Sequence, residues 1–262
     1  MTLPSSNLAV TLVQASLLWH DVAGNHGAIR ALLDDAPATD LIVLPEMFAS
    51  GFSMTPAQVA QTMDGPSVTW MRALAVERSA AVGGSLVIER DGQFVNRFVL
   101  VTPDGDTQHY DKRHRFALAG EDKHYAAGDR RLRVEYRGWR IVPFICYDLR
   151  FPVWCRYATG CDLMLFVANW PNPRRSAWNT LLRARAIENQ CFVAGVNRTG
   201  CDDNEKSYFG DSVLLDGLGE TIVACGDQPM TVTATLDATR LRRLRDKLPF
   251  HRDADAFDIA TP

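Results

Sequence analysis

The chain has 262 residues, of which 47% are hydrophobic and 23% charged, and its formal net charge is −3, from 28 basic and 31 acidic residues. This composition is typical of a soluble globular enzyme whose length buries a sizeable core. The near balance of charge removes any electrostatic basis for binding nucleic acid or an anionic membrane surface.

The N-terminal stretch has neither a basic segment nor a long apolar segment, and no apolar run in the chain is long enough to span a bilayer. We therefore expect a cytoplasmic protein. The six cysteines are expected to stay reduced there. No CxxC pair occurs, and Cys155 and Cys161 lack histidines at zinc-ligand spacing, so no metal or other cofactor is expected.

Apolar periodicity predicts strands that alternate with helices and then run into hairpins, and this order occurs in each half of the chain. The predicted strands lie at 8–13, 41–44, 82–88, 94–101, 107–110, 132–136, 139–145, 162–168, 192–196, 211–215, 220–224 and 230–235. The predicted helices lie at 25–35, 68–80, 153–158, 174–189 and 238–247. The repeated order indicates two similar halves with sheets inside and helices outside.

No stretch of the chain has the composition of a linker, so we expect one domain over residues 1–262, with its core at about 8–236 and a C-terminal helix and tail at 237–262. Residues 111–129 lack apolar periodicity, but their aromatic residues indicate a structured functional loop. Residues 197–207 are expected to form a polar loop. Pro143 has no N–H to donate and indicates a bulge or an unpaired position in its strand.

Cys146 follows an apolar run directly, at the junction between a strand and a helix. Open α/β folds place ligands at such strand ends. The free N–H groups and the dipole of a helix N-terminus favour a thiolate over a thiol. A buried free cysteine that packs as a small hydrophobe is the alternative.

Glu46 also follows an apolar run directly, so it emerges at the same rim as Cys146 if the two strands are parallel neighbours. Lys112 comes straight after a strand, in a segment of alternating charges bracketed by aromatic residues. A solvated carboxylate and a solvated charged face are the structural alternatives for these two residues. Glu121 lies further along the same loop and is unremarkable on its own.

Three segments resemble the signature blocks of the nitrilase superfamily of carbon–nitrogen hydrolases, in that superfamily's order. They are Leu41-Ile-Val-Leu-Pro-Glu46, Tyr110-Asp-Lys112 with His114 and Phe116, and Cys146-Tyr-Asp-Leu-Arg-Phe-Pro152. The resemblance runs from about residue 8 to residue 236. Three further segments are similar to the bacterial ω-amidase, or 2-oxoglutaramate amidase, branch: Pro45-Glu-Met-Phe-Ala-Ser-Gly-Phe52, Asn169-Trp-Pro171 and Arg185-Ala-Ile-Glu-Asn-Gln190.

The resemblance implies a four-layer αββα sandwich, often dimerised through its helices, and a catalytic triad of Glu46, Lys112 and Cys146 with a second glutamate at Glu121. In this chemistry Glu46 takes the thiol proton and returns it to the departing ammonia. Lys112 steadies the thiolate and then the oxyanion, and water hydrolyses the thioester. The backbone N–H of Tyr147 is the expected second oxyanion donor.

The resemblance also implies hydrolysis of the terminal amide of a small 2-oxo dicarboxylate mono-amide, such as 2-oxoglutaramate or 2-oxosuccinamate. The carboxylate of such a substrate needs a cation, and its chain needs pocket walls. The candidates by position are Arg150, Arg174 and Arg175 as cations and Phe48, Tyr125 and Trp170 as walls. Surface arginines and core aromatics are the structural alternatives for these six residues.

Three alternatives stay open from the sequence. Another hydrolase of the superfamily, such as a carbamoylase, an aliphatic amidase or a nitrilase, has the same catalytic residues. A hydrolase that pairs Cys146 with His114 or His124 is compatible with their spacing. A catalytically silent scaffold is disfavoured because every catalytic position is filled.

Overall fold

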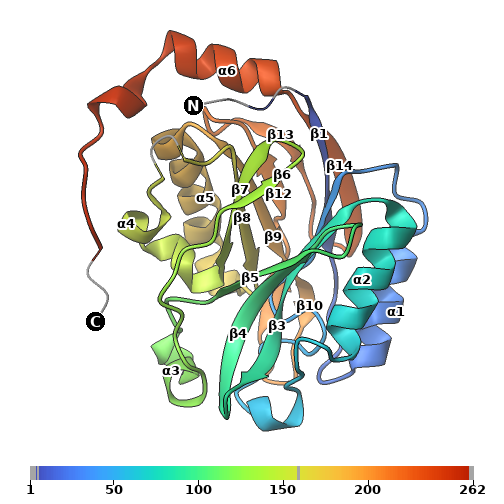
Figure 1. Ribbon diagram of the computed structural model, residues 1–262. Helices are drawn as coiled ribbons and strands as arrows, with labels where there is room; N and C mark the ends of the chain where they lie inside the picture. Colours follow the sequence, from blue (N-terminus) through green and yellow to red (C-terminus); the bar gives the residue numbers. More distant parts are fainter. Residues whose placement is uncertain (1–3, 5, 158–159, 260–262) are drawn as a thin grey trace.

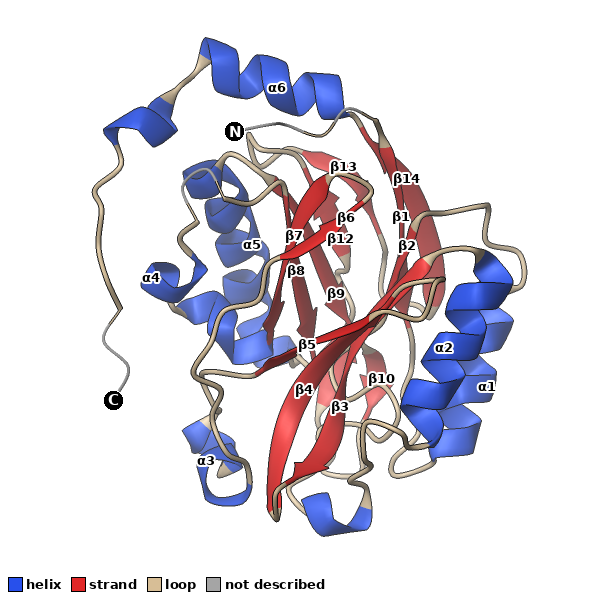
Figure 2. Cartoon of the chain, viewed as in Figure 1, coloured by secondary structure: helices blue, strands red, loops and turns tan. Residues whose placement is uncertain are grey.

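Two six-stranded sheets face each other in the computed structural model, which describes residues 4, 6–157 and 160–259 (Figures 1 and 2). The strand order is β14-β1-β2-β3-β4-β5 in the first sheet and β13-β12-β9-β8-β7-β6 in the second. In each sheet the central three strands, β1–β3 and β7–β9, are parallel and the outer pairings are antiparallel. With helices outside both sheets, this is the expected αββα sandwich.

The first sheet contains β1 (Leu8–Gln14), β2 (Leu41–Val43), β3 (Ala81–Arg90), β4 (Gln93–Val101), β5 (Thr107–Asp111) and β14 (Met230–Leu236). The second contains β6 (Val134–Tyr136), β7 (Trp139–Ile145), β8 (Leu163–Ala168), β9 (Phe192–Asn197), β12 (Val213–Leu215) and β13 (Thr221–Ala224). The helices are α1 (Val22–Leu33), α2 (Pro66–Arg78), α3 (Glu121–His124), α4 (Pro152–Cys155), α5 (Arg175–Asn189) and α6 (Ala238–Lys247). Single 3-10 turns lie at Pro56–Gln58, Ala117–Ala119, Cys146–Arg150, Asn172–Arg174 and Phe250–Asp253.

Every predicted strand and helix has a counterpart, although the helix expected at 153–158 ends at Cys155 and residue 158 lies outside the described residues. The loop expected at 197–207 is wrong. It contains a hairpin of β10 (Thr199–Cys201) and β11 (Ser207–Phe209). Asp202 closes its turn by accepting the N–H groups of Asn204 and Lys206, each at 2.9 Å. Polar turn chemistry therefore supports a strand pair that apolar periodicity does not mark.

Pro143 lies in regular register opposite Leu165 of β8, without a bulge. β6 pairs with β7 only from Trp139 to Ile141. Because side-to-side bonding alternates along a strand, the nitrogen of Pro143 faces the side on which β6 has ended. Pro143 therefore occupies a position where no neighbouring strand needs a backbone N–H, as its sequence context indicates.

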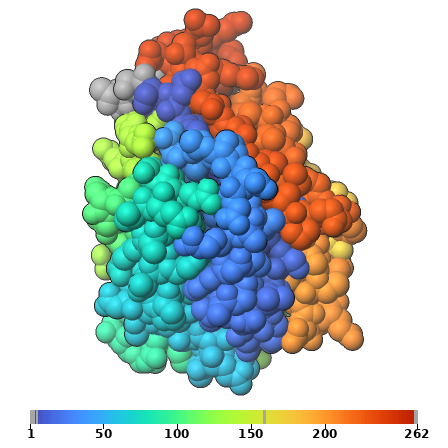
Figure 3. Space-filling view, turned by 90° about the vertical axis from the view of Figure 1, so that its right-hand side faces the viewer, coloured from blue at the N-terminus to red at the C-terminus, as the bar shows by residue number. Residues whose placement is uncertain are grey.

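Alternation along each strand divides the core between the sandwich interior and the outer helices. In β2, Leu41 and Val43 join the cluster between the sheets, whereas Ile42 joins the cluster beneath α1 and α2. Those two helices form the outer surface that Figure 3 shows in blue to cyan. Burying one such side chain contributes about 1.5–3 kcal/mol. The interior cluster contains residues of both sheets, which supports the expectation of a single domain.

Asp162, just before β8, is fully buried and connects α6 to the second sheet. Its carboxylate accepts hydrogen bonds from Arg140 Nε at 2.8 Å and Nη2 at 2.7 Å, and from Arg245 Nη1 of α6 at 2.9 Å. Arg245 also donates to the carbonyl of Gln190 at 2.9 Å. One carboxylate thus balances buried positive charge from two separate elements.

The substitution Asp162→Ala is expected to lower the free energy of unfolding by about 3–5 kcal/mol, because it removes the carboxylate from a buried ion-pair network. Urea denaturation at neutral pH measures this difference. Asp246→Ala, an exposed aspartate next to Arg245 on α6, is the control and should change stability by less than about 0.5 kcal/mol. Equal effects of the two substitutions would contradict the role of Asp162.

Candidate active site

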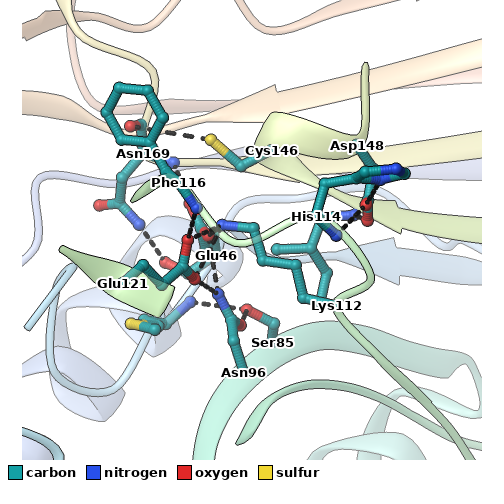
Figure 4. A network of polar contacts seen from close by, with 12 residues as sticks. Glu46, Ser85, Asn96, Lys112, His114, Phe116, Glu121, Cys146, Asp148 and Asn169 are labelled. Carbon is teal, nitrogen blue, oxygen red and sulfur yellow. Dashed lines mark hydrogen bonds and ion pairs between the residues drawn. The ribbon is translucent and has the colours of Figure 1, made fainter. Parts of the chain in front are cut away.

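Three of the candidate catalytic residues meet where strands of both sheets end (Figure 4). Glu46 lies shortly after β2, Lys112 directly after β5 and Cys146 directly after β7. β2 and β7 belong to facing sheets, so they are not the parallel neighbours that would have brought Glu46 and Cys146 to one rim. The residues meet across the sandwich instead.

Lys112 is buried between two carboxylates, with 1% of its surface exposed. Its Nζ lies 2.9 Å from Glu46 Oε1 and 3.0 and 2.9 Å from Glu121 Oε1 and Oε2. Burial alone would lower the pKa of Lys112, but the charges of Glu121 and Glu46 outweigh it, so its pKa is raised. Lys112 is therefore a permanent ammonium donor, and the alternative of a solvated charged face is wrong.

The two glutamates lie in different environments. Glu46 accepts further hydrogen bonds from Asn96 Nδ2 and from the Asn169 N–H, both at 2.8 Å. Glu121, at the start of α3, accepts from the Phe116 N–H at 2.5 Å. Burial and the neighbouring Glu46 charge raise the pKa of Glu121, although Lys112 opposes the shift. Glu121 therefore takes up a proton at higher pH than an ordinary glutamate.

Buried amides and a hydroxyl that sequence reasoning missed hold Glu46 in place. Ser85 Oγ accepts the Met47 N–H at 2.9 Å and donates to Asn96 Oδ1 at 2.8 Å, which turns the amide nitrogen of Asn96 toward Glu46. Asn169 Nδ2 donates to the Glu46 carbonyl at 2.6 Å. The only signal in the sequence for Ser85 and Asn96 is a polar residue inside a hydrophobic strand.

Cys146 begins a 3-10 turn at a φ of 45°, in the left-handed region that costs a residue with a side chain about 1–2 kcal/mol. Burial and then the Glu46 charge raise the pKa of the thiol well above its ordinary value, and Lys112 only partly opposes them. The resting sulfur is therefore a thiol. The geometry therefore gives no support to a resting thiolate held by a helix N-terminus, because the turn is short and burial and the Glu46 charge both favour the thiol.

The histidines lie outside this cluster. His114 Nδ1 is 2.8 Å from Asp148 Oδ1 (Figure 4). The His114 ring stacks on that of Phe151, with centroids 3.7 Å apart. His124 is exposed on α3. The charged groups that shift the pKa of Cys146 are Glu46, Lys112 and Glu121, and no histidine is among them. The described residues therefore do not form a Cys–His pair.

A cavity of about 280 Å³ opens in front of Cys146, and Arg150, Trp170 and Arg174 line it as predicted. The guanidinium of Arg150 lies 4.9 Å from the ring centroid of Trp170, and that of Arg174 lies 4.9 Å from the ring centroid of Phe116. Within the described residues neither arginine has a carboxylate partner. The cavity that holds the thiol is thus lined by two arginines that no carboxylate pairs with among the described residues.

The predictions for Phe48, Tyr125 and Arg175 are wrong, because none of these side chains lines the cavity. Phe48 is buried in the cluster beneath α1 and α2, and the Tyr125 hydroxyl donates to the Ser53 carbonyl at 2.6 Å. Arg175 points away and pairs with Asp211 at 2.7 Å. Lining residues that were not proposed as pocket walls from the sequence include Trp19, Phe52, Phe116, Asp202, Lys206 and Tyr208.

Tyr147 also lines the cavity, and its backbone N–H lies in the first residues of the 3-10 turn, where N–H groups have no acceptor within the turn. Across the described ranges, no group of three or more histidine, cysteine, aspartate or glutamate side chains is arranged to hold a metal ion. Over the same residues, no helix is both long enough and apolar enough to cross a membrane.

Comparisons with known proteins agree with this geometry. The family model for carbon–nitrogen hydrolases matches residues 9–246. The omega-amidase YafV of Yersinia enterocolitica is 47% identical over 96% of this chain and 98% of its own length. The 2-oxoglutaramate amidase of Bacillus subtilis is 33% identical over 82% of this chain and 84% of its own.

The fold has a similarly strong match among solved structures. A CN-hydrolase superfamily protein of Xanthomonas campestris, whose crystal structure has an arsenic adduct in the active site, superposes with a TM-score of 0.95 at 48% identity. The match covers 97% of this chain and 100% of that one. The chain therefore belongs to the carbon–nitrogen hydrolases of the nitrilase superfamily.

Proposed function

We propose that this hydrolase cleaves the terminal amide of a small 2-oxo dicarboxylate mono-amide, such as 2-oxoglutaramate or 2-oxosuccinamate, through a thioester on Cys146. The observation that carries the proposal is a thiol beside a buried Glu46–Lys112–Glu121 cluster, facing a cavity with two unpaired arginines. The activities named for the similar omega-amidases and 2-oxoglutaramate amidases support it.

Acylation begins when Glu46 takes the Cys146 proton as the sulfur attacks the amide carbon. The carbonyl oxygen becomes an oxyanion, which Lys112 Nζ and the Tyr147 N–H stabilise. A charge at about 4 Å contributes roughly 4 kcal/mol at an effective dielectric near 20. Glu121 keeps the ammonium in place by binding it through both carboxylate oxygens, at 3.0 and 2.9 Å.

Ammonia leaves when the intermediate collapses and Glu46 returns the proton to the amide nitrogen. The carbon–nitrogen bond breaks and a thioester remains on Cys146. Glu46 then removes a proton from water, which attacks the thioester carbon. Collapse of the second intermediate releases the carboxylate product, and the proton returns to the thiol.

The cavity fits a short substrate that has a charged end. Its volume of about 280 Å³ lies at the small end of ligand sites. Arg150 and Arg174 are unpaired among the described residues and rest on aromatic rings, so they can bind a carboxylate without breaking an ion pair. We assign the substrate's 2-oxo carboxylate to these two arginines.

We further propose that the chain is a single domain and acts as a homodimer in the cytoplasm. Val153 on α4 and Ile187 on α5 are 57% and 54% exposed on the outer side of the second sheet. A dimer formed through these helices would cover both apolar side chains.

Lys112→Ala is expected to lower kcat for 2-oxoglutaramate by at least about 10³-fold, since it removes the oxyanion donor and leaves two buried carboxylates facing each other. Steady-state ammonia release measures the rate. Lys123→Ala, an exposed lysine on α3, is the matched control and should leave kcat unchanged. His114→Ala should keep roughly a tenth of the rate, whereas a Cys–His hydrolase would lose all turnover with His114 and little with Lys112.

Glu46→Gln is expected to abolish turnover and yet lower the pKa of Cys146. The Glu46 carboxylate disfavours the thiolate, so removing its charge makes the thiolate easier to form, with the Lys112 ammonium still beside it. The rate of Cys146 alkylation by iodoacetamide should therefore rise at lower pH in the variant than in the wild type. A midpoint that moves to higher pH would contradict the assignment of charges around the thiol.

The substrate class is tested by ammonia release from 2-oxoglutaramate, 2-oxosuccinamate, glutamine, a simple nitrile and a carbamoyl amino acid. The 2-oxo amides should have the highest kcat/KM. Release of ammonia without carbon dioxide from these amides would exclude carbamoyl cleavage. A preference for the nitrile or the carbamoyl compound would overturn the proposed substrate.

Within the same panel, Arg174→Gln should raise KM for the 2-oxo amides by about 10–100-fold, the loss of one charged hydrogen bond. It should change KM for an uncharged amide little. Arg175→Gln is the matched control, because this neighbour is paired with Asp211 and does not line the cavity. Equal effects of the two substitutions would exclude Arg174 as the carboxylate ligand.

A further inference from the structure

A second buried network lies behind the active site and is not used by the chemistry. Asp148 is the third residue of the 3-10 turn that begins at Cys146, and it is fully buried. Its Oδ1 accepts the His114 N–H at 3.0 Å and His114 Nδ1 at 2.8 Å. Its Oδ2 accepts the Tyr110 hydroxyl at 2.7 Å and the Ile145 N–H at 3.0 Å.

These partners flank the two groups that must meet in the reaction. Ile145 directly precedes Cys146, while Tyr110 and His114 lie two residues before and two residues after Lys112. One carboxylate therefore connects the backbone around the thiol to the backbone around the ammonium. Figure 4 shows His114 and Asp148 together on the side of Lys112 away from the glutamates.

The partners of Asp148 are themselves held, so the direction of each hydrogen bond is determined. The Tyr110 oxygen accepts the Trp154 Nε1–H at 3.0 Å and the Arg113 N–H at 3.2 Å, which leaves its own proton for Asp148. A carboxylate only accepts, so His114 Nδ1 carries the proton toward it. Asp148 is thus surrounded by four donors, a requirement that an amide of the same shape cannot meet.

We propose that Asp148 and His114 are positioning residues for the reaction, which hold the Cys146 turn at a fixed distance and orientation from Lys112. The Cys146 backbone is in the left-handed region and persists there only if its surroundings fix it. Before the cysteine, the Asp148 carboxylate supplies this restraint by accepting the Ile145 N–H. After the cysteine, the backbone carbonyl of Asp148 accepts the Phe151 N–H at 3.0 Å. Small displacements of reacting groups cost large factors in rate.

The test compares Asp148→Asn with Asp162→Asn. Asp162 is an equally buried aspartate that also accepts several hydrogen bonds, but it lies before β8, whereas the site residue Asn169 follows that strand. Asp148→Asn should lower kcat about 10–100-fold and raise KM by a smaller factor, because Arg150 shares the turn with Cys146 whereas Arg174, the other proposed carboxylate ligand, lies outside it. Asp162→Asn should lower the melting temperature and leave kcat unchanged. Equal losses of kcat in both variants, or wild-type kcat in Asp148→Asn, would overturn the proposal.

A pair of substitutions at the partly exposed His114 keeps the proposal testable if Asp148→Asn does not fold. His114→Leu removes the side-chain donor and should lower kcat about tenfold. His114→Asn offers an amide N–H near the position of Nδ1 and should restore kcat to within about threefold of wild type. No difference between the two variants would overturn the role of His114.

The kcat measurements rest on the proposed substrate, so a substrate-independent measurement accompanies them. Iodoacetamide alkylation of Cys146 should become about tenfold faster in Asp148→Asn, because a displaced thiol gains solvent and its pKa falls toward the ordinary value. It should be unchanged in Asp162→Asn. A wild-type enzyme inactive on 2-oxo amides refutes only the proposed function, whereas unchanged alkylation in Asp148→Asn refutes the positioning role.

Discussion

The site depends on the burial of one ammonium with two carboxylates. Lys112, Glu46 and Glu121 are almost completely removed from water, and none of them could be charged there alone. One cation between two anions leaves an excess of negative charge, which Asn96 and the backbone N–H groups of Phe116 and Asn169 compensate with hydrogen bonds. Burial and the charge of Glu46 together raise the pKa of the neighbouring Cys146 thiol and keep it protonated. The chemistry of the site therefore follows from this cluster.

The sandwich buries these three charged groups together by bringing strand ends from two rigid sheets to one place. Backbone strain is found beside two of the groups that meet there: Met47, next to Glu46, and Cys146 both have a φ of 45°. Ser85 binds the Met47 N–H and Asp148 binds the N–H of the residue before Cys146. Such strain persists where the surroundings determine the backbone. A densely packed core on both sides of each sheet supplies that rigidity.

Much of this architecture could be predicted because it follows from local periodicity, whereas side-chain direction could not. Strand ends located Glu46, Lys112 and Cys146, but Arg174 and Arg175 are adjacent in the sequence. The backbone at the start of α5 directs Arg174 into the cavity and Arg175 toward Asp211, and the sequence does not show this difference. Polar residues such as Asn96 are recognised as part of a site only once the partner across the sheet is known. The β10–β11 hairpin was missed because its polar sequence hides an extended pairing.

The protonation state of the thiol is where local reasoning and the assembled structure differ most. A lysine near a cysteine suggests a thiolate, but here burial and the two carboxylates together outweigh the one ammonium and raise the pKa of Cys146. A resting thiol fits amide hydrolysis well, because the departing nitrogen needs a proton that a preformed thiolate could not supply. Glu46 can transfer the thiol proton to that nitrogen. The proton removed when the sulfur attacks is then the one that leaves with ammonia, and Glu46 carries it in both steps. The burial and the negative charge that make Cys146 a poor nucleophile at rest therefore also retain the proton that the departing ammonia needs.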